Sequence, residues 1–249
     1  MNAYLIDKFT EIEDFHWWFE GRRQILSKIF KKFLQKKLED VVILDIGCGT
    51  GSNIKFLSNF GNVHGIDNMK LAIDYCKKKG AKKVKLANAC KLPYRNRMFD
   101  VVVFLDVLEH IENDELAIKE AKRVLKKNGL IIITVPALPI IWSQHDSMQN
   151  HHRRYRRDEI ESLAENANLK ILNMVFFNFL LSFPIVIIRF LSKISLFKGL
   201  GEHDSQLNFN LAKIRIINKI LLTIFKTEIA FSKFINYPFG ISLLAVIKK

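Results

Sequence analysis

The feature that most constrains this chain is a glycine-rich loop that directly follows a short apolar run. Residues 41–44 are all apolar, and the loop Asp45-Ile46-Gly47-Cys48-Gly49-Thr50-Gly51 comes next. A wholly apolar, β-branched run is typical of a strand buried in a parallel sheet. Glycines after such a strand let the backbone approach a ligand closely and aim its N–H groups at it. The order therefore predicts a strand, then a ligand-binding turn.

The same alternation of strand and helix continues along the chain. Further strands are expected at 62–67, 82–87, 99–106, 130–135, 169–177 and 238–247, and helices at 22–38, 69–79, 113–127 and from near Asp158. Strands that alternate with helices are joined by right-handed crossovers and form a mainly parallel sheet. The sequence therefore predicts an α/β fold whose ligands bind at the carboxyl ends of the strands.

The spacing of the glycines separates two kinds of nucleotide site. The dinucleotide fingerprint G-x-G-x-x-G needs its third glycine at position 52, where this chain has Ser52. The chain instead has an acid followed by glycines at alternate positions, Gly47, Gly49 and Gly51. This spacing disfavours a nicotinamide dehydrogenase.

That order resembles motif I of the class I S-adenosylmethionine-dependent methyltransferases. Three further segments resemble the same family in the same order: Asp67 at the end of the second strand, Asn88-Ala89-Cys90 before Leu92-Pro93-Tyr94, and 99–106 followed by Leu108-Glu109-His110-Ile111. The resemblance covers residues 41–135. It implies a Rossmann-like seven-stranded mixed sheet flanked by helices, with the last strand antiparallel.

The resemblance also implies S-adenosylmethionine as cofactor and assigns its contacts. Asp45 is expected to reach the methionine amino group directly or through water, and Asp67 to accept both ribose hydroxyls. Asn88 replaces an acid that is usual in the family, and its amide oxygen is expected to accept from the adenine amino group. The full expected set is Asp45, Gly47, Cys48, Gly49, Gly51, Asp67, Asn68, Asn88, Ala89, Leu105 and Asp106. The alternative is that Asp45 caps a helix and the glycines only form a turn.

Candidate catalytic groups follow the fourth and fifth strands. Methyl transfer from a sulfonium depends mostly on alignment and desolvation, but a hydroxyl acceptor also needs a base. His110 follows the fourth strand, and an imidazole that is neutral near pH 7 suits that role. The alternative is that His110 only orders the loop before the next helix. His145 and His151, in the loop after the fifth strand, complete the expected catalytic set.

That loop resembles the signature Trp-Ser-x-x-Asp … Gly-His-x-Arg-Arg-Tyr of a methyltransferase subgroup often found with glycan or lipid biosynthesis. The matching residues are Trp142, Ser143, Asp146, His151, Arg153, Arg154 and Tyr155, with Asn150 in place of the glycine. Because Arg binds phosphate or carboxylate through two N–H groups, an anionic acceptor is expected. Arg154, Tyr155 and the N-terminal Trp18 are assigned to the acceptor, although Trp18 could equally be a packing residue.

No metal site is assigned from the sequence. His145, His151 and Asp146 were weighed as ligands, but their spacing matches no compact metal motif. The three cysteines, Cys48, Cys76 and Cys90, form no CxxC pair, and they fit a reducing, cytoplasmic setting. The acidic N-terminus lacks an apolar core, so a signal peptide is not expected.

Four segments are expected: an N-terminal helical cap (1–40), the cofactor-binding core (41–177), a basic and apolar helical insertion (178–238) and a final core strand (239–249). Residues 171–188 are uncharged and long enough for a borderline membrane span, but Asn173, Asn178, Ser182 and Pro184 and the strand expected at 169–177 argue against one. As a helix, 211–226 places Arg215, Lys219 and Lys226 on one face and these apolar residues opposite: Leu211, Ile214, Ile217, Leu221, Ile224 and Phe225. That helix is expected to lie in a membrane interface or to pack on the core or a second subunit.

These observations together predict a methyltransferase for a small or lipid-linked acceptor, acting on oxygen or carbon. The net charge of +14 leaves anionic lipid, nucleic acid and an anionic substrate open as partners. An RNA or protein methyltransferase is the first alternative, but no aromatic base-reading motif appears and nucleic acid is not expected. A non-catalytic, membrane-associated binding module is the second. Peripheral contact at the inner face of the membrane through 178–233 and a homodimer are the remaining partner hypotheses.

Overall fold

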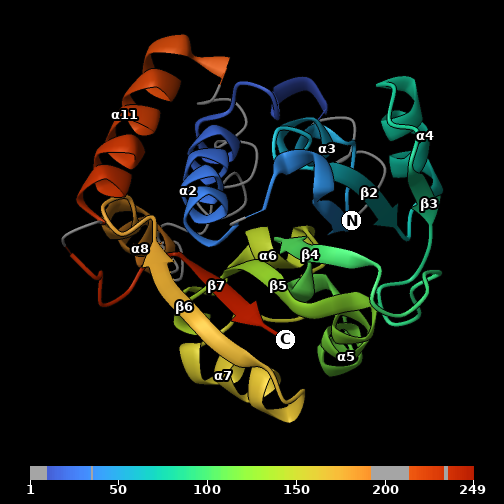
Figure 1. The fold of residues 1–249 in the computed structure, drawn as a ribbon. Coiled ribbons are helices and arrows are strands. Elements are labelled where there is room, and N and C mark those ends of the chain that lie inside the picture. The colour runs from blue at the N-terminus through green and yellow to red at the C-terminus, as the bar shows by residue number, and fades with distance from the viewer. Residues whose placement is uncertain (1–9, 35, 192–212, 233–234) are drawn as a thin grey trace.

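The computed structural model describes residues 10–34, 36–191, 213–232 and 235–249, which build a seven-stranded sheet covered by helices on both faces (Figure 1). The strands are β1 (Val42–Ile46), β2 (Asn62–Asp67), β3 (Val84–Leu86), β4 (Phe99–Leu105), β5 (Leu125–Pro136), β6 (Lys170–Phe177) and β7 (Ser242–Lys248). Their order is β3-β2-β1-β4-β5-β7-β6. The strands from β1 to β5 pair in parallel, whereas β7 is antiparallel to both of its neighbours. The expected Rossmann-like mixed sheet with an antiparallel last strand is confirmed.

The helices of four or more residues connect these strands. They are α2 (Trp17–Phe33), α3 (Ser52–Leu57), α4 (Lys70–Lys78), α5 (Asp114–Val124), α6 (Gln144–Met148), α7 (Arg157–Asn166), α8 (Ser182–Leu191) and α11 (Arg215–Phe231). Short 3-10 turns η1 (Leu38–Asp40), η2 (Leu108–His110) and η3 (Pro139–Ile141) lie between them. The expected helix at 113–127 is wrong at its end, because Leu125 already pairs with Phe99 in the sheet. The expected helix at 22–38 begins earlier, at Trp17, because His16 caps it.

The two faces of the sheet carry separate apolar clusters. Side chains alternate along a strand, so Val102 and Phe104 of β4 pack with α5 and α7, whereas Val101 and Val103 pack with α2 and α11. Figure 1 shows these helix pairs on opposite sides of the sheet. All seven residues of β4 are buried. Burial on both faces explains why this strand reads as a continuous apolar run in the sequence.

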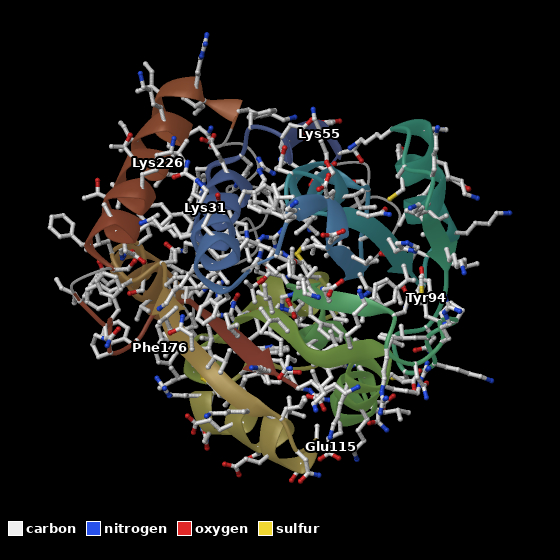
Figure 2. The ribbon with its side chains drawn as sticks, in the orientation of Figure 1. Lys31, Lys55, Tyr94, Glu115, Phe176 and Lys226 are labelled. Atoms are coloured by element: carbon white, nitrogen blue, oxygen red, sulfur yellow. The ribbon has the colours of Figure 1, made fainter. Side chains whose placement is uncertain are left out.

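Within the described residues, the connection between β6 and β7 is helical and contains α8 and α11. Helix α11 lies against α2, and Lys226 and Lys31 mark these neighbouring helices in Figure 2. Asn218 of α11 accepts a hydrogen bond from the Trp17 N–H at 2.8 Å, and Lys226 pairs with Glu20 at 3.0 Å. Leu221, Ile224 and Phe225 pack into the cluster with α2, so this part of the expected apolar face covers the core and is not available to a membrane.

Residues 171–188, which are long enough for a membrane span but were expected to form a strand, build most of β6 and the beginning of α8. No helix among the described residues is both long and apolar enough to cross a membrane. Leu211, which belongs to the apolar face expected for the helix at 211–226, lies outside the described residues. The division of the chain into four segments stays a prediction.

Candidate functional site

A cavity of about 770 Å³ opens at the carboxyl ends of the parallel strands. It is lined by the glycine loop, by Asp67 and Asn68 after β2, and by Asn88 and Ala89 after β3. Its wall continues through Leu105 and Asp106 after β4 to the loop after β5. Small-molecule sites in proteins commonly measure about 300–1,000 Å³. The cavity therefore joins the expected cofactor residues and the expected acceptor residues in a single space.

The glycine loop depends on left-handed backbone at two positions beside the cavity. Gly47 has φ +70°, and a Cβ built there would lie 2.5 Å from Cγ2 of Val107. Gly49 has φ +53°, and its N–H donates to Oδ2 of Asp67 at 3.0 Å. Because other residues reach positive φ only at a cost and a side chain at position 47 would collide, the loop requires glycine there.

Asp67 at the end of β2 and Asn88 after β3 both stabilise neighbouring loops through hydrogen bonds. The second oxygen of Asp67 accepts from the Met69 N–H at 2.9 Å, while burial raises the pKa of the carboxyl against these hydrogen bonds. The side-chain oxygen of Asn88 accepts from the Cys90 N–H at 2.8 Å. That contact forms a turn of the kind that Asn commonly makes with its own backbone. Both side chains line the cavity, and their assigned contacts with ribose and adenine stay predictions.

Asp45 lies beneath the glycine loop and does not line the cavity. Its side chain is fully buried, and neither carboxylate oxygen has a hydrogen-bond partner among the described residues. Burial raises the pKa of Asp45 to about 8, although the charge of Arg22 works against this rise. A buried carboxyl without a partner is costly. It fits the ammonium group of a bound S-adenosylmethionine, reached through water, as the missing partner.

Arg22 ties α2 to this end of the sheet. Its guanidinium pairs with the Asp106 carboxylate, donates to the Leu105 carbonyl oxygen at 3.3 Å and donates to Oδ1 of Asn53 at 3.2 Å. The other oxygen of Asp106 accepts from the Thr134 hydroxyl at 3.1 Å. Asp106 has φ +58°, an uncommon conformation outside glycine that recurs at functional sites. The carboxylate of this expected cofactor residue is thus already engaged by a buried arginine.

The N-terminal segment closes the other side of the cavity through residues that the sequence reasoning did not assign. Glu13 accepts from the hydroxyl of Thr50 in the glycine loop and from Lys79, both at 2.5 Å. His16 is buried, which lowers its pKa to about 4, and its neutral ring caps α2 by accepting from the Trp18 N–H at 3.1 Å. In this segment the sequence predicted a site role for Trp18 alone.

Trp18 is a packing residue that also borders the cavity. Its ring lines the cavity and also stacks on Phe177 and Phe225, with ring centroids 5.7 and 5.8 Å apart. The stack joins α2, β6 and α11, so the side chain is held in place by packing. Its contact with an acceptor stays a prediction.

Glu109, His110 and His151 meet at the far end of the cavity. One ligand-type atom from each of the three lies within 4.8 Å of the others. The rings of His110 and His151 are in edge contact, with centroids 4.7 Å apart. Burial, and then the neighbouring His151, lower the pKa of His110 to about 4. Burial, and then the charge of Asp106, raise the pKa of Glu109 well above its usual value. Loops separated by forty residues in the chain thus place two imidazoles and a carboxyl together.

Asn150 shapes this arrangement from the loop after β5. It adopts φ +57°, which explains why the resembling signature has glycine there, and Asn is among the residues that best tolerate this conformation. Its carbonyl oxygen accepts from Nδ1 of His110 at 3.2 Å. Two residues further along the chain, the backbone N–H of His152 donates to the carbonyl oxygen of Glu109 at 2.7 Å. The two loops are therefore bonded to each other on both sides of the cluster.

Arg154 lines the cavity, but its guanidinium is turned to internal partners. It donates to Oδ1 of the buried Asp146 at 2.8 Å and to the carbonyl oxygen of Ala137 at 2.9 Å. Arg189 of α8 lies 3.6 Å from the other oxygen of Asp146. Asp146 therefore offsets part of the positive charge that was expected to hold an anionic acceptor.

His145 lies next to this group and lines the cavity. Its Nε2 lies 2.6 Å from the Gln149 amide nitrogen. Burial, and then the charge of Arg189, lower its pKa to about 3. A ring that stays neutral at all ordinary pH values is a weak proton acceptor, which argues against His145 as the base.

Besides Asp45, two further expected site residues do not line the cavity. Tyr155 is buried in the core, where its hydroxyl donates to Oδ2 of Asp114 at 2.7 Å, and it does not line the cavity, so its expected acceptor contact stays a prediction without support from this geometry. The residue is instead held by the bridge between Ala137 and Tyr155, which turns the ring inward. Gly51 faces Cys76 and begins α3, so its part is to shape the loop.

Comparison with known proteins agrees with this geometry. Residues 44–133 match a family model described as a methyltransferase domain. An uncharacterized protein of Methanocaldococcus jannaschii is 39% identical over 46% of this chain and 45% of its own length. A ubiquinone biosynthesis O-methyltransferase of Pelagibacter ubique is 32% identical over 53% of this chain and 64% of its own length. The chain thus spans about half to two thirds of the length of these curated relatives.

Solved structures share the fold. Phosphoethanolamine N-methyltransferase 2 of Haemonchus contortus, in complex with S-adenosylmethionine, superposes with a TM-score of 0.57 at 21% identity, over 91% of this chain and 52% of that one. A methyltransferase of Aquifex aeolicus superposes with a TM-score of 0.50 at 22% identity, over 60% and 82% of the two chains. The sheet order, the glycine loop and the match of residues 44–133 to the methyltransferase domain model together support S-adenosylmethionine as the cofactor of this domain.

Proposed function

We propose that this chain methylates a hydroxyl oxygen of a small or lipid-linked acceptor that is bound beside the cofactor. The observation that carries the proposal is the continuity of the cavity from the glycine loop to His110 and His151. When bound, S-adenosylmethionine would supply a methyl group whose carbon the acceptor oxygen attacks in line, while the C–S bond breaks and S-adenosylhomocysteine leaves. The protein then has to align the acceptor, exclude water and receive the proton of a hydroxyl.

Neutral imidazoles in the acceptor end of the cavity support an oxygen acceptor. Burial keeps His110 uncharged near pH 7, so its ring can accept a hydrogen bond from an acceptor hydroxyl and orient it. Carbon acceptors that are already activated need no such group. The curated relatives include O-methyltransferases of ubiquinone biosynthesis, which agrees with an oxygen acceptor of phenolic type.

Helix α8 supports an apolar or lipid-linked acceptor. Ile185 and Arg189 of this helix line the cavity, while Phe183 and Ile187 are 49% and 59% exposed on its outer side. On α11, Ile216 and Ile220 are 72% and 54% exposed beside Lys219. Apolar side chains next to lysines suit the surface of an anionic membrane. We propose that α8 and α11 touch such a surface while the cavity takes up its acceptor.

Cofactor binding is the first experiment. Calorimetric titration with S-adenosylmethionine and S-adenosylhomocysteine should give micromolar binding, and Asp67→Ala should weaken it by at least about tenfold because a polar group left unpaired costs about 1–3 kcal/mol. Asp158→Ala, an exposed acid on α7, is the matched control and should bind as the wild type does. A folded wild-type chain that binds neither compound contradicts the proposal and favours the binding-module alternative.

The acceptor is tested with labelled cofactor and three acceptor classes: water-soluble phenols, phenols with a polyprenyl tail, and RNA. Transfer of label to the tailed phenol in vesicles, and little to RNA, is the expected result. Label in RNA with a strong salt dependence would instead support the RNA methyltransferase alternative.

Membrane contact is tested by co-sedimentation with vesicles that contain phosphatidylglycerol. Ile220→Asp on α11 should reduce the bound fraction severalfold. Leu116→Asp is the matched control, because Leu116 is 41% exposed on α5, on the opposite face of the sheet (Figure 1). Equal sedimentation of both variants and the wild type would contradict the contact.

A further inference from the structure

The cluster of Glu109, His110 and His151 has the composition of a metal site. Its three ligand-type atoms lie within 4.8 Å of one another at the wall of the cavity. Two imidazoles and one carboxylate form the protein ligands of several catalytic zinc sites, where the fourth position is left to water or substrate. The three residues come from two loops that are bonded to each other, so their spacing is fixed by the fold.

The hydrogen bonds behind the two histidines favour metal binding. Nδ1 of His151 donates to Oδ1 of Asp146 at 3.1 Å, and Nδ1 of His110 donates to the carbonyl oxygen of Asn150 at 3.2 Å. Histidines that bind metals almost always donate their other ring N–H to a carboxylate or a backbone carbonyl. Because both Nδ1 atoms carry the proton, both Nε2 atoms keep a lone pair for a cation.

The third member lacks the partner that its burial demands. Glu109 is 1% exposed, and its Oε2 has no hydrogen-bond partner among the described residues. Burial removes the hydration of this carboxyl oxygen, and no hydrogen bond replaces it. The two buried arginines whose charge acts on Glu109 are already paired, Arg22 with Asp106 and Arg154 with Asp146. A cation between Glu109 and the two rings would satisfy the carboxylate.

We propose that Glu109, His110 and His151 bind one divalent transition-metal ion of the zinc type, with a fourth position open to the cavity. Imidazole ligands select this class of ion over Mg²⁺, which prefers a shell of oxygen atoms. Asp146 is the positioning residue that orients His151. The role of the ion toward the acceptor rests on the proposed function, whereas its binding does not.

An ion at this position supplies what a hydroxyl acceptor requires. An oxygen atom held at the fourth position would be oriented beside the cofactor, and its pKa would fall, as it does for water on catalytic zinc. The released proton would pass to water in the cavity. The hydroxyl acceptor would then need no side-chain base from the cluster.

The experiment begins with the full chain, stripped of metal by a chelator and titrated with Zn²⁺ and with Co²⁺. One ion per chain is expected by calorimetry and elemental analysis. The Co²⁺ form should show the visible absorption bands of a four-coordinate site. Mg²⁺ at millimolar concentration should not displace Zn²⁺.

Three variants assign the ion to the cluster. Glu109→Gln and His151→Gln should each weaken Zn²⁺ binding by more than about tenfold, and Asp146→Asn by about 10–100-fold, as is usual for a partner behind a ligand. His152→Gln is the matched control, because this neighbour also lines the cavity but is not in the cluster. Binding of S-adenosylhomocysteine by each variant shows that it is folded.

A wild-type chain that binds S-adenosylhomocysteine but no stoichiometric Zn²⁺ overturns the metal site and leaves the methyltransferase function standing. Zinc binding that the Glu109 and His151 variants leave unchanged also overturns it, because the ion then lies elsewhere. A chain that binds Zn²⁺ with the expected variant pattern but no cofactor supports the metal site and contradicts the proposed function.

Discussion

His151 donates from Nδ1 to Oδ1 of Asp146 at 3.1 Å, and the same oxygen accepts from Nε of Arg154 at 2.8 Å. Asp146 is fully buried. Burial would raise its pKa, but the hydrogen bond from His151 and the charges of Arg154 and Arg189 outweigh burial and hold the pKa well below its usual range. The ionised carboxylate therefore sets the direction of the His151 ring and compensates the two arginines.

Replacing Asp146 by Asn should destabilise the protein strongly. Removing one partner of a buried ion pair leaves the other charge uncompensated and costs about 3–5 kcal/mol. We expect the free energy of unfolding, measured with urea, to fall by about 3 kcal/mol. Glu161→Gln is the matched control, because its pair with Arg157 is exposed on α7 and such pairs contribute about 0–1 kcal/mol. Equal effects of the two variants would contradict the assigned role of Asp146.

The same carboxylate should make stability fall in strong acid. Its pKa in the folded state lies below the unfolded value of 3.8, so its contribution is fully present above that pH. The contribution is lost as the pH falls below about 4, because the folded state must then take up the proton. Unfolding curves of the wild type and Asp146→Asn should therefore converge below pH 4, and a constant difference there would contradict this reading.

His16 should give a second pH dependence at milder acidity. Its pKa is about 4 in the folded state against 6.5 when exposed, because its ring is buried and neutral. Its contribution is therefore present above pH 6.5 and is lost as the pH falls toward 4. His16→Asn keeps an acceptor at the helix cap but cannot be protonated, so stability should change less over this range. His152→Asn, at an exposed residue, should leave the slope as in the wild type.

Gly47→Ala should cost more than a backbone penalty alone. Both Gly47 and Gly80 have positive φ, but a Cβ at Gly47 would lie 2.5 Å from Val107, whereas nothing lies within 4 Å at Gly80. Gly80→Ala should lower the unfolding free energy by about 1–2 kcal/mol and leave cofactor binding unchanged. Gly47→Ala should lose more stability and bind S-adenosylhomocysteine at least about tenfold more weakly. Similar losses of stability and of S-adenosylhomocysteine binding in the two variants would show that Val107 and the loop can move to accommodate the added Cβ.

Gly21→Ala tests the packing of α11 on α2. Alanine normally stabilises a helix interior by about 0.5–1 kcal/mol over glycine. At this position a Cβ would lie 2.1 Å from Cδ1 of Phe225, so destabilisation is expected in thermal unfolding. Adding Phe225→Leu to Gly21→Ala should cost less than Phe225→Leu costs in the wild type, because the two changes couple. Additive effects would contradict the close packing.

Local sequence patterns determined the framework of this protein. The bounds of β2 agree with the sequence to the residue, and each of the seven strands lies where an apolar run predicted one. The glycine loop was also predicted, because strand, turn and loop chemistry are set by neighbouring residues. Periodicity could not place the end of α5, since Lys126 and Lys127 suit a helix and only pairing with β4 makes this segment a strand.

The tertiary structure alone decided what fills the acceptor end of the cavity. Asp106 and Arg22 lie in different parts of the chain, as do His110 and His151, and no local pattern states that they meet. Tyr155 belongs to the same short motif as His151, yet its ring turns into the core. Parallel strands end at one edge of a sheet and bring their following loops together. Sequence therefore determined which strands end there, and packing decided which side chains face one another.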